Sequence, residues 1–137
     1  MMELETPEEL AKILGGARIA SGVAFIAMSR PLGHLLIGED AYGAGAQLFI
    51  RAFGARDALL GAGTLLAMRS KRPGRPWLIA AGLADAFDAA ATAAAYQQLP
   101  LRRRALTFAV SAIPAVLNLS TAGRLADQRS VARSAGP

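Results

Sequence analysis

The chain contains no cysteine, and among its 137 residues it has only one Trp, two Tyr and five Phe. The absence of cysteine excludes disulfides, thiol catalysis and Cys-based metal sites. Charged residues are also scarce, at 18%, whereas 53% of the residues are hydrophobic and most of these are Ala, Leu and Ile. Small apolar side chains, together with 14 Gly, suit helices that pack closely in lipid. At this length we expect one domain.

The net charge of +5 does not indicate a nucleic-acid partner. Nucleic-acid-binding surfaces combine clustered basic side chains with aromatic ones, whereas here the basic residues gather at the ends of apolar segments. Basic residues in that position are typical of membrane edges. Four glutamates within the first nine residues are opposite to the basic start of a signal peptide, so we expect no cleavage.

Residues 41–68 form the central segment of the chain, and their only charged members are Arg51, Arg56 and Asp57. A soluble helix of this length would show a whole charged face. At the centre of a bilayer an ionised group costs at least about 2.5–3.5 kcal/mol, so these three side chains should face protein and find partners. A compact Ala-rich soluble bundle is the alternative, but residues 77–98 also lack the polar face that it would need.

Four helical spans are predicted, which makes the fold class all-α, a membrane-embedded bundle of four transmembrane helices. The first helix begins in water, because Thr6, Pro7 and Glu9 match an N-cap, a first helical position and a capping box. Residues 31–43 are predicted to be a connection whose apolar run Leu35–Ile37 rests at the interface. The spans are about 11–30, 42–68, 77–98 and 105–123, in a domain of residues 1–123 that precedes a polar, disordered tail at 124–137.

Two spans carry further packing signals. Gly16, Ala20 and Ala24 recur every four residues in the first span, a small-residue pattern that lets another helix approach closely. In the last span Pro114 predicts a kink, and Asn118 is a lone polar group that we expect to form a hydrogen bond between helices.

Helical rise places several charged residues at matching depths. Counted from the loop at 69–76, Arg56 lies about 20 Å and Asp88 about 18 Å into antiparallel helices, which predicts an ion pair between them. The same arithmetic brings Arg18 roughly level with Asp85. The candidate buried ion network therefore holds three bases and three acids whose charges sum to zero: Arg18, Arg51, Arg56, Asp57, Asp85 and Asp88.

Within this set Arg51 has no obvious partner. It lies about 27 Å from the inner loop, near the outer interface, where its long side chain would reach water. Two interpretations of the set stay open. It is either a clamp that fixes the pairing of the first three spans, or a working site, such as an ion or proton relay or a polar pocket for a small ligand.

No catalytic residue, metal site or cofactor is predicted. His34 is a lone histidine in a connecting loop with no cysteine or second histidine, which is typical of a solvated residue. The run Gly61-Ala62-Gly63 follows no strand and precedes no helix start, so it is a packing surface rather than a phosphate loop.

The distribution of Lys and Arg predicts a multi-pass protein of the cell membrane with both termini in the cytoplasm. With the N-terminus inside, eight basic residues lie on the inner side and four, Arg30 and Arg102 to Arg104, lie outside. The expected partner is the lipid bilayer, and a homo-oligomer or a larger membrane complex is left open.

The tetrad Gly54-Ala55-Arg56-Asp57, followed by Gly61 and later by Asp85, resembles a pattern in small bacterial four-helix membrane proteins of an uncharacterised family. Their second helix typically carries G-x-R-D with a later glycine, and their third carries an acid. The resemblance covers about residues 11–120 and implies a four-helix membrane fold without an established activity. Asp88 is an addition to that pattern.

Three classes of function follow from these observations. The first is a structural or interaction protein with a buried Arg/Asp network, which leaves the chain without enzymatic activity. The second is a small-solute or proton-linked transporter, although four-helix multidrug exporters carry a carboxylate in their first helix where this chain has Arg18. The third is a membrane-embedded isomerase or cyclase that acts on a lipophilic substrate with an Asp as the acid.

Overall fold

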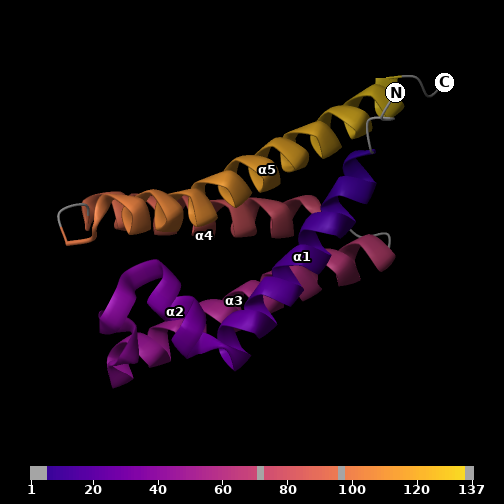
Figure 1. The fold of residues 1–137 in the computed structure, drawn as a ribbon. Helices are drawn as coiled ribbons and strands as arrows, with labels where there is room; N and C mark the ends of the chain where they lie inside the picture. The colour runs from indigo at the N-terminus through magenta and orange to yellow at the C-terminus, as the bar shows by residue number, and fades with distance from the viewer. Residues whose placement is uncertain (1–5, 71–72, 96–97, 135–137) are drawn as a thin grey trace, which may run out of the picture.

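A computed structural model describes residues 6–70, 73–95 and 98–134, and within these ranges all regular structure is helical (Figure 1). The all-α fold class is therefore confirmed. The elements are α1 (Pro7–Ala27), α2 (Ser29–Ile37), the short 3₁₀ helix η1 (Gly38–Tyr42), α3 (Ala44–Arg69), α4 (Arg75–Ala94) and α5 (Leu101–Ser134).

The long helices form two pairs. Helix α1 packs along α3 and α4 packs along α5, and contacts between the two pairs are sparser (Figure 1). Although α3 and α4 are consecutive, they belong to different pairs. They meet near their connection, where Trp77 covers Gly63, and again deeper in the bundle through the ion network described below.

The first helix starts as predicted and ends early. The Thr6 hydroxyl accepts a hydrogen bond from the Glu9 amide at 3.3 Å, and the Glu9 carboxylate accepts one from the Thr6 amide at 3.0 Å, which completes the capping box. The helix ends at Ala27 because the ring of Pro31 would clash with the Ala27 carbonyl if the helix continued. Pro31 lies instead in the first turn of α2, where a missing amide proton costs little.

The predicted connection at 31–43 is mostly helical, and it packs against α5. Arg103 donates from Nη1 to the His34 carbonyl at 2.8 Å, and Thr107 donates from its hydroxyl to the Leu36 carbonyl at 3.2 Å. Gly38 follows α2 with a φ of 80°, which favours glycine, and its open α-carbon leaves room for the Arg103 guanidinium. The apolar run Leu35–Ile37 is thus part of a docked helix.

The last helix is longer than the predicted span. It runs without interruption to Ser134, which corrects the predicted disorder for residues 124–134; residues 135–137 lie outside the described ranges. Leu125 is buried against Ala11, Leu78 and Ala122, so α1, α4 and α5 share a small apolar core near the chain ends. This packing stabilises the part of the helix that follows Gly123.

Burial in the bundle is inverted relative to a soluble protein. Large apolar side chains point outward: Leu48, Phe49, Leu59 and Phe87 are 70–76% exposed. Among the described residues the buried apolar side chains are seven alanines, two leucines and Pro7, and the buried polar or charged ones are Arg18, Ser29, Asp57, Thr64, Asp85, Ser111, Asn118 and Thr121. Water would oppose this arrangement, whereas a lipid solvent favours it.

Three of the described helices are long and apolar enough to cross a membrane: Pro7–Ala27, Arg75–Ala94 and Leu101–Gln128. They correspond to the first, third and fourth predicted spans, and they indicate a multi-pass membrane protein. Helix α3 is not among them, because every 18-residue stretch of it contains three charged residues.

Glycines allow α1 and α3 to pack with their backbones almost in contact. A methyl group at Gly54 would lie 2.5 Å from the Gly22 carbonyl oxygen, and one at Gly61 would lie 2.5 Å from the Gly15 carbonyl oxygen. The helices therefore run antiparallel, with Gly15 opposite Gly61 and Gly22 opposite Gly54. The predicted contact face of Gly16, Ala20 and Ala24 is displaced by one residue: Gly16 has nothing near it and Ala20 is exposed.

We expect Gly22→Ala to destabilise the bundle by about 1–3 kcal/mol, because its methyl group would lie 2.6 Å from the Ala58 amide nitrogen and push the two helices apart. The matched control is Gly16→Ala in the same helix, which should be neutral or stabilising by up to about 1 kcal/mol. Thermal unfolding in detergent measures both. Equal effects of the two substitutions would contradict the glycine contact.

Candidate functional site

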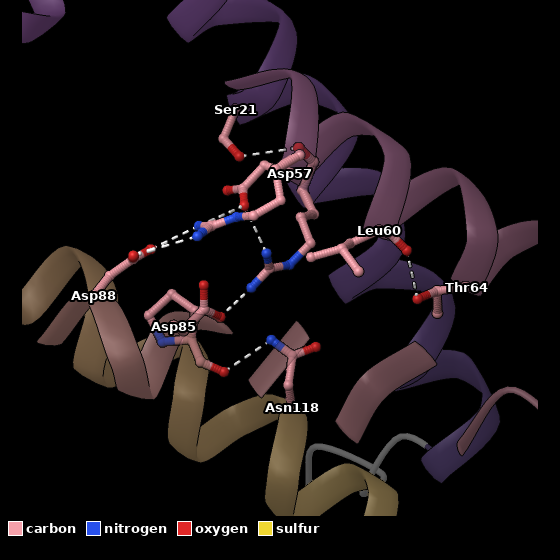
Figure 2. A network of polar contacts seen from close by, with 10 residues as sticks. Ser21, Asp57, Leu60, Thr64, Asp85, Asp88 and Asn118 are labelled. Carbon is pink, nitrogen blue, oxygen red and sulfur yellow. Dashed lines mark hydrogen bonds and ion pairs between the residues drawn. The ribbon is translucent and has the colours of Figure 1, made fainter. Parts of the chain in front are cut away.

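Arg18 lies at the centre of the bundle and joins three helices. Its guanidinium is buried, and it donates from Nη1 to Oδ1 of Asp57 on α3 at 2.8 Å and from Nη2 to Oδ2 of Asp85 on α4. Both carboxylates are themselves buried, with side-chain exposures of 9% and 5%. Because this one guanidinium pairs with an acid on α3 and with an acid on α4, it attaches the α1/α3 pair to α4 (Figure 2).

Arg56 makes a second connection between the pairs, and its partner is the one predicted from helical depth. Its Nη1 and Nη2 donate to the two oxygens of Asp88 at 3.2 and 2.6 Å, in the fork geometry that suits a guanidinium and a carboxylate. Nη2 also lies 3.3 Å from Oδ1 of Asp57. The guanidinium carbon is 4.7 Å from the centre of the Phe53 ring, a cation–π distance. This pair is less buried than Arg18, with 33% of the Arg56 side chain exposed.

The contacts form one chain of alternating charge in the order Asp85, Arg18, Asp57, Arg56, Asp88. Asp57 occupies the middle and accepts from both arginines with the same oxygen. Figure 2 shows the carboxylates of Asp57, Asp85 and Asp88 turned toward a common centre between the helix pairs. We call these five residues the ion chain. Each carboxylate in it accepts a hydrogen bond from a guanidinium, an arrangement suited to holding helices together.

Arg51 does not belong to the ion chain, which corrects the predicted set of six. Its side chain is exposed, and its Nε donates to the Ser29 hydroxyl at 3.3 Å. Ser29 in turn donates to Gln47 at 2.7 Å, so Arg51 belongs to a separate polar group between α2 and α3. The predicted charge balance fails as a result. Two arginines face three aspartates, and the ion chain has a formal charge of −1.

A matching pattern in two helices, absent from the sequence-based prediction, explains how Arg18 and Asp57 meet. Glycines flank Arg18 three residues before and four residues after it, and glycines flank Asp57 at the same two spacings. Because α1 and α3 are antiparallel and their glycines contact each other, the opposite charges are brought to the same level between two close-packed glycine pairs. Each spacing is visible in the sequence, but the contact is predicted only when the spacing around Arg18 is compared with the spacing around Asp57.

Two cavities lie between the helix pairs, one at each end of the ion chain. The Asp85 cavity, about 290 Å³, is lined by Arg18, Asp57 and Asp85 together with Ser21, Asn118 and apolar side chains. The Asp88 cavity, about 280 Å³, is lined by Asp88 and Ser111 among mainly apolar residues. The two share Phe25, Phe53 and Val110, and the rings of Phe25 and Phe53 meet edge to face at 5.1 Å.

Other candidates from the sequence lie outside the ion chain. His34 is on α2 with Nδ1 3.6 Å from a Glu39 carboxylate oxygen, and no group of three or more metal-ligating side chains occurs among the described residues. Asn118 donates from its amide to the Pro114 carbonyl at 2.8 Å within α5, rather than to another helix as expected. Its side chain is buried on the wall of the Asp85 cavity.

The three arginines of the predicted set should differ in their effect on stability. Arg18→Met leaves two buried carboxylates without their shared partner and should cost about 3–5 kcal/mol. Arg56→Met should cost less, about 1–3 kcal/mol, because that pair is partly exposed. Arg51→Met is the matched control and should change stability by less than about 0.5 kcal/mol. Thermal unfolding in detergent gives the order, and an effect of Arg51 equal to that of Arg18 would contradict it.

A double-mutant cycle tests the pair between α3 and α4. We expect Arg56→Met and Asp88→Leu to be coupled by about 1–3 kcal/mol, because either single change strands a partly buried charge and the double change removes both. Asp88→Leu combined with Arg51→Met is the control cycle and should be additive within about 0.5 kcal/mol. Additivity in the first cycle as well would mean that Arg56 and Asp88 do not interact.

Comparison of the chain with known protein families, with curated proteins and with solved structures finds no match. The function is therefore argued below from the ion chain, the cavities and the inverted burial.

Proposed function

We propose that the chain is a four-span protein of the cell membrane, in which the ion chain locks two helix pairs into one bundle and gives it a structural or interaction role. The observation that carries the proposal is the inverted burial. Five charged residues meet between the pairs, while leucine and phenylalanine cover the outside. Such charges are tolerated in a membrane when they face protein and pair with one another.

The proposed fourth span is α3. It is antiparallel to α1, and two pairs of opposed glycines hold the two helices together over much of their length. If α1 crosses the bilayer, α3 must lie at the same depth. Its charges do not oppose this position, since Arg56 and Asp57 are paired within the bundle and Arg51 lies near its first turns, where its side chain would reach the interface.

We propose that both termini are cytoplasmic. The start of α1, the end of α5, the end of α3 and the start of α4 lie at one end of the bundle, whereas α2, the end of α4 and the start of α5 lie at the other (Figure 1). This arrangement suits an even number of crossings. In the sequence, eight basic residues belong to the segments that begin or end at the first end and four to those at the second, which favours the first end as the inner one.

The arrangement also bears on the other two classes of function. An isomerase or cyclase would need an acid whose oxygens meet the substrate without another partner, whereas each carboxylate of the ion chain accepts a hydrogen bond from an arginine. A small-solute or proton-linked transporter is the second candidate, and the two cavities between the helix pairs favour it.

We further propose kinship with the four-helix proteins that carry G-x-R-D in their second helix. In support, Gly54 allows the close approach of α1, and Arg56 and Asp57 are consecutive members of the ion chain.

Single cysteines test the four crossings, since the chain has no cysteine of its own. Glu39→Cys, Ser70→Cys and Gln98→Cys lie at exposed positions before α3, after α3 and after α4. In intact cells a membrane-impermeant maleimide should label the first and third and should label Ser70→Cys only after permeabilisation. The cysteine-free parent is the control.

If Glu39→Cys and Ser70→Cys were labelled from the same side, α3 would not cross and the proposal would fail. Labelling of Ser70→Cys alone would retain four spans and reverse the orientation. Release of the chain from membranes by alkaline carbonate would exclude membrane insertion altogether.

A further inference from the structure

The ion chain has one more negative charge than positive, and no described charged side chain nearby removes the excess. Asp88 faces Arg56 and Asp57 of α3, and Arg18 of α1 continues the chain. Helix α5 contributes the uncharged Ser111 and Thr107 to the surrounding wall, and α2 contributes Leu36. An unbalanced charge in the interior of a membrane protein is costly, so a positive charge from outside the chain is needed.

The Asp88 cavity has the features of a site for such a charge. The Asp88 carboxylate lines it beside the phenyl rings of Phe25, Phe49 and Phe53. One cation is already bound by this chemistry, since the Arg56 guanidinium pairs with Asp88 and stacks on Phe53. Carboxylate and aromatic groups together recognise ammonium ions that have apolar substituents.

A second observation on the same cavity is independent of the charges. Ser111 is 6% exposed and lines the cavity, and within the described ranges its hydroxyl forms no hydrogen bond. The hydroxyl oxygen is not among the fully buried atoms without a partner, so it is open to the cavity, and a molecule bound there would lie against it. The volume of about 280 Å³ lies at the lower end of ligand pockets, which limits the occupant to a small molecule.

We propose that the Asp88 cavity binds a small lipophilic cation, an ammonium ion with an apolar body, in exchange for a proton that the ion chain carries when the cavity is empty. With the cation beside Asp88, Arg56 pairs with Asp57 and Arg18 pairs with Asp85. Three neutral pairs result, and one proton leaves to water. This proposal goes beyond the structural role proposed above and does not depend on the number of spans.

The sign of the pH dependence follows from the exchange. At low pH the ion chain holds its proton and has no negative charge to offer, so the cation binds weakly. As the pH rises the proton is lost more easily and the affinity should increase, by up to about tenfold for each pH unit.

Benzyltrimethylammonium and its neutral isostere neopentylbenzene form a matched pair of probes, because they differ only in a charged nitrogen replaced by carbon. Equilibrium dialysis against the full chain in lipid nanodiscs, with empty nanodiscs subtracted, should give saturable binding of one cation per chain. Neopentylbenzene should not compete at the same free concentration. In weakly buffered solution, binding should release up to one proton. Equal competition by the neutral isostere would overturn the proposal.

Two substitutions at opposite ends of the ion chain distinguish an effect of the excess negative charge from an effect of direct contact with the cation. Asp88→Asn removes the charge inside the cavity, whereas Asp85→Asn removes one that lines the other cavity and leaves the carboxylate of Asp88 in place. Either change makes the ion chain neutral, so each should weaken cation binding by about tenfold or more and abolish its pH dependence. Because Asp85 does not line the Asp88 cavity, a contact-only site would be insensitive to the second change.

Arg51→Gln is the control, because Arg51 lies outside the ion chain and should leave both affinity and proton release unchanged. Melting temperatures of all variants in nanodiscs show which are folded. Unchanged affinity in either folded Asn variant would overturn the proposal, as would binding that is independent of pH. If one Asn variant fails to fold, the other variant and the pH profile of the parent still decide the outcome.

Discussion

The bundle depends on Arg18, a single guanidinium shared between acids on two other helices. Its partners lie on α3 and α4, so it holds the α1/α3 pair to the α4/α5 pair where other contacts between the pairs are sparse. A buried guanidinium is stabilised when carboxylates accept from it, and each buried acid likewise needs a donor. Position, pairing and burial of the three side chains are therefore mutually dependent, and the second connection through Arg56 extends the same arrangement.

Small residues allow the helices to approach closely enough for these ion pairs to form. Glycines on α1 and α3 bring the two backbones into contact, which shortens the distance that Arg18 must reach to Asp57. Many large apolar side chains of the bundle point outward instead, where lipid is a favourable solvent for them. The same feature explains why the interior consists mainly of alanine, glycine and polar groups.

A charged connection between two loosely packed helix pairs differs from an apolar one in its response to added charge. An alternating chain with a carboxylate at each end can shift its pairing along its length, so a positive charge at one end changes the contacts at the other. The two cavities lie at these ends and share the phenyl rings that separate them. Structural locking and ligand exchange are therefore compatible in the same five residues.

Local pattern and helical rise were enough to predict the helical class, the capping box at Thr6 and the pairing of Arg56 with Asp88, because these depend on residues close in sequence or on a single hairpin. The length of α5 and the docking of α2 depend on contacts with distant helices, such as Leu125 with Ala11, and no local signal carries that information. The position of Arg51 was decided in the same way. The sequence-based prediction placed Arg51 in the buried network, which made the network neutral. In the structure the rotation of α3 against α1 directs the Arg51 side chain toward Ser29 and away from the network. The residues alone determined that charges would be buried among helices; the helix packing decided which of them met, and so produced the excess negative charge.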